Sequence, residues 1–140
     1  RRTPHEFAIA YRSVSGLEED EWFLAARCRL VPGEKAVALQ RIKALLERRA
    51  TTQPTSEYNC GSVFRNPPGM HAARLIESCQ LKGFKMGGAM VSLKHANFII
   101  NHEGQAQASD IEGLIAHVHR SILEQTGIDL IREVHILGEH

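Results

Sequence analysis

The sequence predicts an α+β protein whose C-terminal half folds as a small mixed α/β sandwich. Amphipathic helical segments alternate with apolar, strand-like segments between residues 59 and 138, which is the pattern of helices packed on a sheet. A polar, proline-bearing stretch precedes them and indicates a boundary between two parts of the chain. With 140 residues, 43% hydrophobic and 24% charged, the chain can form one compact core and is too apolar to be disordered.

The N-terminal part is expected to contain a strand, a helix and a linker. Residues 21–32 (EWFLAARCRLVP) are rich in apolar residues and end at a Pro-Gly pair, which indicates a strand. Residues 34–49 carry apolar side chains at helical spacing and end in two arginines, which suit the negative pole of a helix. Residues 50–59 (ATTQPTSEYN) show neither the helical nor the strand-like spacing of apolar residues. We therefore expect one domain to end at residue 55 and the next to span residues 56–140.

A short helix and a strand are predicted next. Residues 70–81 (MHAARLIESCQL) place Ala72, Leu75, Ile76 and Cys79 on one face at helical spacing. The glycines at 83, 87 and 88 indicate tight turns or close packing, because neither phosphate-loop spacing occurs around them. Residues 95–104 (HANFIINHEG) indicate a strand that ends in a turn.

The last helix and the last strand are also marked in the sequence. Ser109 and Glu112 have the spacing of a capping box, and Gly127 is expected to end the helix in the left-handed conformation. From residue 128 to 138, apolar and polar residues alternate as in a strand, so that Glu133 points away from the most apolar face. The expected buried face of the helix consists of Ile111, Leu114, Ile115, Val118 and Ile122.

Composition argues against several functional classes. The formal charge of +1 predicts no strong attraction to nucleic acid or to an anionic membrane, and the apolar runs are too short to span a bilayer. Three widely spaced cysteines favour a reducing compartment, the cytoplasm, over a disulfide framework. No metal site is expected, since His117 and His119 point to different sides of a helix. No signal peptide is recognised and the sequence opens without methionine, so we expect either that residues are missing upstream of Arg1 or that the chain was trimmed.

Two polar residues stand out as candidates for a functional site. Ser62 lies in the rigid, irregular segment NCGSVFRNPPG, where it can be a turn residue, a phosphate contact or a catalytic group; the GxSxG pattern of serine hydrolases is absent. Glu133 is a mid-strand carboxylate among apolar neighbours, which is unfavourable unless it is paired, hydrogen-bonded or neutralised. A salt bridge with Arg132 or Arg12 is the structural alternative for Glu133.

Three segments carry a family resemblance: NCGSVFRNPPG, LIESCQLKGFKMGGAMVSLKHANFIIN and REVHILGEH. In this order and at these distances, they resemble the C-terminal part of the UDP-N-acetylenolpyruvoylglucosamine reductases, also called UDP-N-acetylmuramate dehydrogenases. The upstream segments FAIAYRSV and ATTQP are similar to this family as well. The resemblance covers nearly the whole chain. It implies that residues 1–55 are the C-terminal end of a FAD-binding domain and that residues 56–140 are the substrate-binding domain.

The resemblance also implies a reaction. Members of this family are flavoproteins in which NADPH reduces FAD, and hydride then passes to the enolpyruvyl group of UDP-N-acetylglucosamine enolpyruvate, giving UDP-N-acetylmuramate for peptidoglycan. The matching positions make Ser62 the expected proton donor. Glu133 and Arg12 are expected to act on the substrate carboxylate.

Further correspondences are looser. Tyr11, Asn66 and His95 are expected to contact the substrate, whereas His135 stands where the family commonly has arginine. The glycine-rich loops that hold the FAD pyrophosphate in this family lie in an N-terminal region outside these residues, so we expect that region of the same enzyme to bind most of the FAD, and no cofactor-binding residue is assigned here. The alternative function is a stand-alone sugar-nucleotide-binding module without redox activity.

Overall fold

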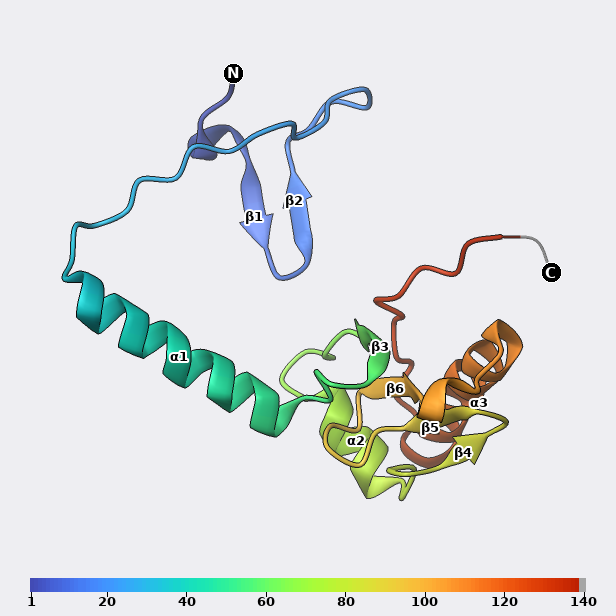
Figure 1. Ribbon diagram of the computed structural model, residues 1–140. Helices are drawn as coiled ribbons and strands as arrows, with labels where there is room; N and C mark the ends of the chain where they lie inside the picture. The colour runs from blue at the N-terminus through green and yellow to red at the C-terminus, as the bar shows by residue number, and fades with distance from the viewer. Residues whose placement is uncertain (139–140) are drawn as a thin grey trace. The chain divides into compact units, whose positions relative to one another are not determined.

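The computed structural model describes residues 1–138 and divides into two compact units, one of residues 1–34 and one that begins at Lys35 (Figure 1). The first unit contains a single 3₁₀ turn, Pro4–Glu6, and an antiparallel hairpin. The hairpin joins β1 (Ala8–Ala10) to β2 (Ser13–Ser15), with Ala10 paired to Ser13 across a two-residue turn.

The strand predicted for residues 21–32 is wrong, because these residues form neither helix nor strand. A strand satisfies its backbone N–H and C=O groups only by pairing with a neighbour, and no described segment pairs with this one. Its apolar side chains are exposed in the described unit, including Leu24 at 95% and Val31 at 92%.

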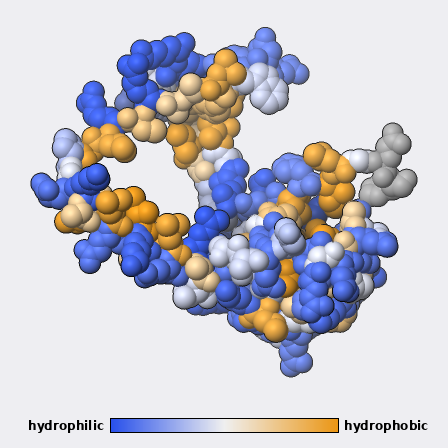
Figure 2. Space-filling view, in the orientation of Figure 1, coloured by the Kyte–Doolittle hydropathy of each residue, from blue (hydrophilic) through white to orange (hydrophobic). Residues whose placement is uncertain are grey.

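The first predicted helix is confirmed as α1 (Lys35–Thr52), which runs three residues further than expected. In its last turn, Thr51 and Thr52 both donate their hydroxyls to the carbonyl oxygen of Arg48. The apolar stripe of α1 is exposed, with Ile42 and Leu46 more than half accessible, and Figure 2 shows hydrophobic side chains along this helix. Periodicity therefore predicted the helix but not its burial.

The second unit is built on a four-stranded antiparallel sheet with the order β3-β6-β5-β4, and the α+β class is confirmed. The strands are β3 (Tyr58–Ser62), β4 (Lys85–Met86), β5 (Ala89–Val91) and β6 (Phe98–Asn101). The strand expected within residues 95–104 is β6, and it leads into a 3₁₀ turn, His102–Gly104.

Two helices pack on this sheet. The predicted helices are confirmed as α2 (Ala72–Ser78) and α3 (Ala108–Thr126), and α3 lies against β4, β5, β6 and α2. The expected apolar faces form the core, with Ile76, Leu114 and Ile122 at most 1% exposed. None of the described helices is long and apolar enough to cross a membrane.

The start of α3 differs from the predicted capping box. The residue before the helix is Gln107, and Asp110, not Glu112, accepts its backbone N–H at 3.0 Å. Asp110 also accepts the N–H of Gly88 at 3.1 Å, so that the same carboxylate binds the helix start and the β4–β5 turn. The other end is as predicted, with Gly127 in the left-handed conformation at φ 71°.

The strand predicted for residues 128–138 is also wrong. Only an isolated bridge between Phe64 and Arg132 forms, flanked by bonds from the N–H of Arg65 to Ile131 and from the N–H of Glu133 to Val63. Leu130 anchors this segment in the core at 2% exposure, but the residues that follow are mostly exposed. Alternating polarity is thus consistent with the burial of Leu130. The segment forms no strand, because it pairs with the described residues only at the Phe64–Arg132 bridge.

Candidate active site

A β-bulge determines how Ser62 is presented. Asn59 pairs with Ile100 and Ser62 pairs with Phe98, so that β3 contains one residue more than β6 between these two pairs. Gly61 lies in this bulge at φ 86°, a conformation that disfavours any residue with a Cβ. The extra residue changes the alternation of side chains along β3, and bulges of this kind redirect side chains next to functional sites.

Asn59 braces the bulge. Its side-chain oxygen accepts the N–H of Gly61 at 2.9 Å, and its amide nitrogen donates to the carbonyls of Pro54 and Glu57 at 2.9 and 2.7 Å. One side chain therefore ties the linker to the residue before Ser62. These three bonds restrain the segment on the N-terminal side of Ser62.

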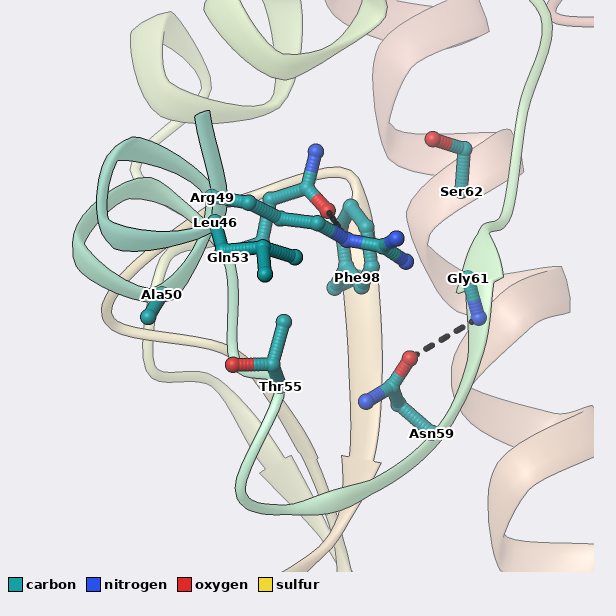
Figure 3. Close-up of a pocket in the computed structure, with 9 residues that line it drawn as sticks. All are labelled: Leu46, Arg49, Ala50, Gln53, Thr55, Asn59, Gly61, Ser62 and Phe98. Atoms are coloured by element: carbon teal, nitrogen blue, oxygen red, sulfur yellow. Dashed lines mark hydrogen bonds between the residues drawn. The ribbon is translucent and has the colours of Figure 1, made fainter. Parts of the chain in front are cut away.

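Ser62 faces an open pocket of about 790 Å³ (Figure 3). One wall comes from the end of α1 and the residues after it, and the other from β3 and β6. In Figure 3 the terminal nitrogens of Arg49 are directed toward the β3 wall, while its Nε donates to Gln53 at 3.3 Å. The lining residues are Leu46, Arg49, Ala50, Gln53, Thr55, Asn59, Gly61, Ser62 and Phe98.

Sequence reasoning missed the α1 wall of this pocket. The arginine pair at the end of the helix was interpreted only as a match to the helix dipole, yet Arg49 lines the same pocket as Ser62. Lys94, from the loop before β6, donates to the carbonyl of Ala50 at 3.0 Å and so joins the end of α1 to the β-sheet body. No signal in the sequence marked this pairing, because the two residues are 44 positions apart.

Glu133 and Ser62 are linked through the backbone. The N–H of Glu133 donates to the carbonyl oxygen of Val63, the residue after Ser62, at 2.8 Å. Glu133 is half-buried, whereas Arg132 beside it is exposed. The expected proton donor and a residue expected to act on the substrate carboxylate therefore belong to segments that are hydrogen-bonded to each other.

His95 lies next to the pocket wall. Its ring meets Phe98 edge-on at a centroid distance of 4.8 Å, and its Nδ1 accepts the N–H of Asn97 at 3.3 Å. Partial burial lowers the pKa of His95, so that the neutral ring is favoured. With Nδ1 accepting, the neutral ring carries its proton on Nε2 and is able to donate one hydrogen bond.

Asn66 has a structural contact in this unit. Its side-chain oxygen accepts the N–H of Ala72, the first residue of α2, at 3.0 Å. This bond holds the proline-containing loop against the helix. Whether Asn66 also contacts a substrate stays a prediction.

Arg12 and Tyr11 form the turn between β1 and β2 in the first unit. Arg12 has φ 56°, which is unusual for a residue with a side chain, and its guanidinium lies 5.6 Å from the centroid of the Tyr11 ring. Strained residues of this kind cluster at functional sites. The structure thus separates the candidates into Ser62, Asn66, His95 and Glu133 in one unit and Tyr11 and Arg12 in the other.

The described residues hold no cluster of three or more His, Cys, Asp or Glu side chains suited to a metal ion. What the second unit offers is a hydroxyl held by a braced bulge at the wall of a pocket, with a histidine able to donate next to that wall. A group held at one position in this way can transfer a proton to a single atom of a bound molecule.

Comparison with known families finds a match over residues 53–137 to the model described as UDP-N-acetylenolpyruvoylglucosamine reductase, C-terminal domain. The reductase of that name from Legionella pneumophila (strain Paris) is 64% identical over 138 residues, covering 99% of this chain and 45% of the relative. The one from Methylococcus capsulatus is 56% identical over 138 residues, with the same coverage. The chain therefore spans about 45% of the length of these relatives.

A solved structure has the same fold. The crystal structure of the UDP-N-acetylenolpyruvylglucosamine reductase from Thermus caldophilus matches with a TM-score of 0.74 and 33% sequence identity. The match covers 94% of this chain and 47% of that protein. The family model, the relatives and the solved structure all carry the same reductase name.

Proposed function

Because this chain belongs to the UDP-N-acetylenolpyruvoylglucosamine reductase family, we propose that it forms the C-terminal, substrate-binding part of a cytoplasmic flavoenzyme. The whole enzyme reduces the enolpyruvyl group of UDP-N-acetylglucosamine enolpyruvate to UDP-N-acetylmuramate, a step of peptidoglycan precursor synthesis. NADPH is the reductant and FAD the cofactor. Residues 1–55 are the end of the FAD-binding part and residues 56–140 the substrate-binding domain.

The observation that supports this proposal most strongly is the link between the Ser62 and Glu133 segments beside a pocket. A backbone hydrogen bond of 2.8 Å joins Glu133 to Val63, and Ser62 lines the pocket. The reaction needs a proton donor and a group that stabilises negative charge within one substrate length of each other. A shared backbone contact is a direct way to keep two such groups together.

Ser62 has the role of proton donor. Addition of hydride to the β-carbon of the enolpyruvyl group leaves negative charge on the α-carbon and carboxylate, as in an enolate. A hydroxyl is a weak acid in water, but the enolate is a strong base, so that correct placement matters more than intrinsic acidity. The braced bulge around Ser62 provides such placement.

Arg12 and Glu133 stabilise the enolate. A guanidinium can bind two carboxylate oxygens at once and oppose the charge that develops on them. Glu133 is proposed to act on the same carboxylate, from a segment that is hydrogen-bonded to the residue after Ser62. Arg12 lies at the turn of the β1–β2 hairpin, with its guanidinium 5.6 Å from the centroid of the Tyr11 ring.

The residues present do not fit the nucleotide part of FAD. The two glycine-rich patterns that bind phosphate groups, G-x-x-x-x-G-K-S/T and G-x-G-x-x-G, do not occur in the sequence. No cofactor-binding residue is assigned to this chain. When bound to the rest of the enzyme, FAD supplies the hydride. This chain supplies substrate binding, charge stabilisation and the proton.

The test is a dependence of turnover on both cofactor and substrate in the full-length enzyme. The purified protein should carry a flavin absorbance spectrum, and it should oxidise NADPH to completion only when UDP-N-acetylglucosamine enolpyruvate is present. Equal NADPH oxidation with and without that substrate would refute the proposed reaction. Calorimetric binding of the UDP-sugar by a full-length protein that contains no flavin would instead support a binding module.

A further inference from the structure

We propose that Asn97 is a positioning residue for Ser62 and Glu133, an inference that rests on the proposed function. Asn97 directly precedes β6 and is 4% exposed. Its side-chain oxygen accepts the N–H of Phe64 at 3.0 Å, and its side-chain nitrogen donates to the carbonyl of Phe64 at 2.8 Å. One side chain, 33 residues away, thus satisfies both polar backbone groups of a residue that is itself 1% exposed.

Asn97 extends the ladder of hydrogen bonds between β3 and β6 beyond the ends of the two strands. The named strands end with the Ser62–Phe98 pair, and the backbone carbonyl of Asn97 accepts the N–H of Val63 at 2.9 Å. An amide side chain carries a C=O and an N–H in the same arrangement as a peptide group, so that it extends the ladder to Phe64. The amide supplies donor and acceptor on two separate atoms, whereas an ionised carboxylate lacks the donor and an aliphatic side chain lacks both.

The same short segment also holds Glu133. The carbonyl of Val63 accepts the N–H of Glu133, and the N–H of Arg65 donates to Ile131 at 2.9 Å. Residues 63–65 are therefore bonded to Asn97 as well as to the Glu133 segment, and they follow Ser62 without a break. Any displacement of these residues changes the position of the Ser62 hydroxyl relative to Glu133.

The variant Asn97→Asp tests this role in the full-length enzyme, because it keeps the shape of the side chain and places an oxygen against the carbonyl of Phe64. Reduction of the flavin by NADPH should stay within about twofold of wild type, and its reoxidation by the enolpyruvyl substrate should slow about 10²-fold, the loss that a displacement of about 1 Å produces. The solvent deuterium isotope effect on reoxidation should increase, because proton transfer from a displaced Ser62 becomes rate-limiting.

Asn101→Asp is the matched control. It changes the same residue type at the other end of β6, but its side-chain oxygen accepts the N–H of Ala106 at 2.8 Å, away from the serine segment. Both half-reactions and the isotope effect should remain at wild-type values in this variant. A structural loss common to both asparagines would instead affect both variants alike.

The outcomes separate the inference from the proposed function. A wild-type enzyme that does not couple NADPH oxidation to the substrate refutes the function itself, and the inference with it. An active wild type with Asn97→Asp unchanged, or slowed equally in both half-reactions, overturns the inference alone. If Asn97→Asp does not fold, Asn97→Ser is the second variant. Amide hydrogen exchange of the wild type then decides whether Asn97 holds Phe64 through its two hydrogen bonds. Slow exchange at Phe64 supports this contact, and exchange as fast as in exposed loops overturns it.

Discussion

The N–H of Glu133 donates a hydrogen bond of 2.8 Å to the carbonyl oxygen of Val63, and this bond joins two segments that are 70 positions apart in the chain. Ser62 precedes Val63 directly, so that the bond connects the expected proton donor to the expected charge-stabilising carboxyl. The contact involves only backbone atoms. Side chains at both positions can therefore be changed without removing it, which makes the following substitutions informative.

Ser62→Ala should slow the reoxidation of the reduced flavin by the enolpyruvyl substrate by about 10²- to 10⁴-fold, the range for loss of a general acid. Reduction of the flavin by NADPH should be nearly unchanged, since it needs no proton from Ser62. Stopped-flow absorbance of the flavin measures the two steps separately. Ser78→Ala is the control, because the Ser78 hydroxyl donates to the carbonyl of Leu75 in its own helix, away from the pocket. Equal losses in both steps would exclude the proton-donor role.

Glu133→Gln should also slow the substrate half-reaction severely, by about 10²-fold or more, because the substitution changes the charge and the hydrogen bonding of the group proposed to act on the substrate carboxylate. The hydrogen bond from the backbone of Glu133 to Val63 does not depend on the side chain, so the link to the serine segment should be kept in the variant. Single-turnover kinetics and calorimetry together check this. Glu124→Gln, at an exposed position of α3, is the control. Near-normal turnover of Glu133→Gln would remove Glu133 from the mechanism.

Gly61→Ala should lower the free energy of unfolding by about 1 kcal/mol, since Gly61 has φ 86° and a Cβ there is strained. No atom lies within 4 Å of the added Cβ, so the loss is conformational and not steric. Relaxation of the bulge should also reduce the substrate half-reaction. Urea unfolding and stopped-flow kinetics measure both effects. Gly33→Ala, where φ lies outside the left-handed range and space is also open, should leave stability nearly unchanged or slightly raised.

Asp110 should make the stability of the chain depend on acid pH. Hydrogen bonds from the backbone N–H groups of Gln107 and Gly88 lower the pKa of Asp110 in the folded protein. A lowered folded-state pKa stabilises the fold above the unfolded-state pKa of about 4, and this stabilisation is lost as pH falls through the lower, folded-state value. Urea unfolding between pH 2 and 7 should therefore show a steeper acid loss for wild type than for Asp110→Asn.

Asp20→Asn, at an exposed position of the first unit, is the control for that series. Its acid dependence should match that of wild type. If Asp110→Asn loses stability below pH 4 as steeply as wild type does, the two backbone contacts do not govern the acid response.

Local sequence signals predicted the helices better than the strands. The apolar spacing of α3 agrees with a buried face that includes Leu114 and Ile122, since helical hydrogen bonds form within the segment itself. Residues 21–32 and 128–138 have strand-like composition, but a strand also needs a partner, and no local pattern reports whether one is present. The capping box at Ser109 failed for a related reason, because Asp110 also binds Gly88 from a distant turn.

The sequence by itself determined the family, the α+β class, the buried faces of α2 and α3 and the residue types expected at the site. These follow from local periodicity and from long specific segments such as NCGSVFRNPPG. Only the tertiary structure decided that a bulge at Gly61 presents Ser62, that the end of α1 forms the opposite pocket wall, and that Asn97 and Glu133 hold the same three residues. The physical reason is that these contacts join residues tens of positions apart, and such pairs form through the packing of the whole unit.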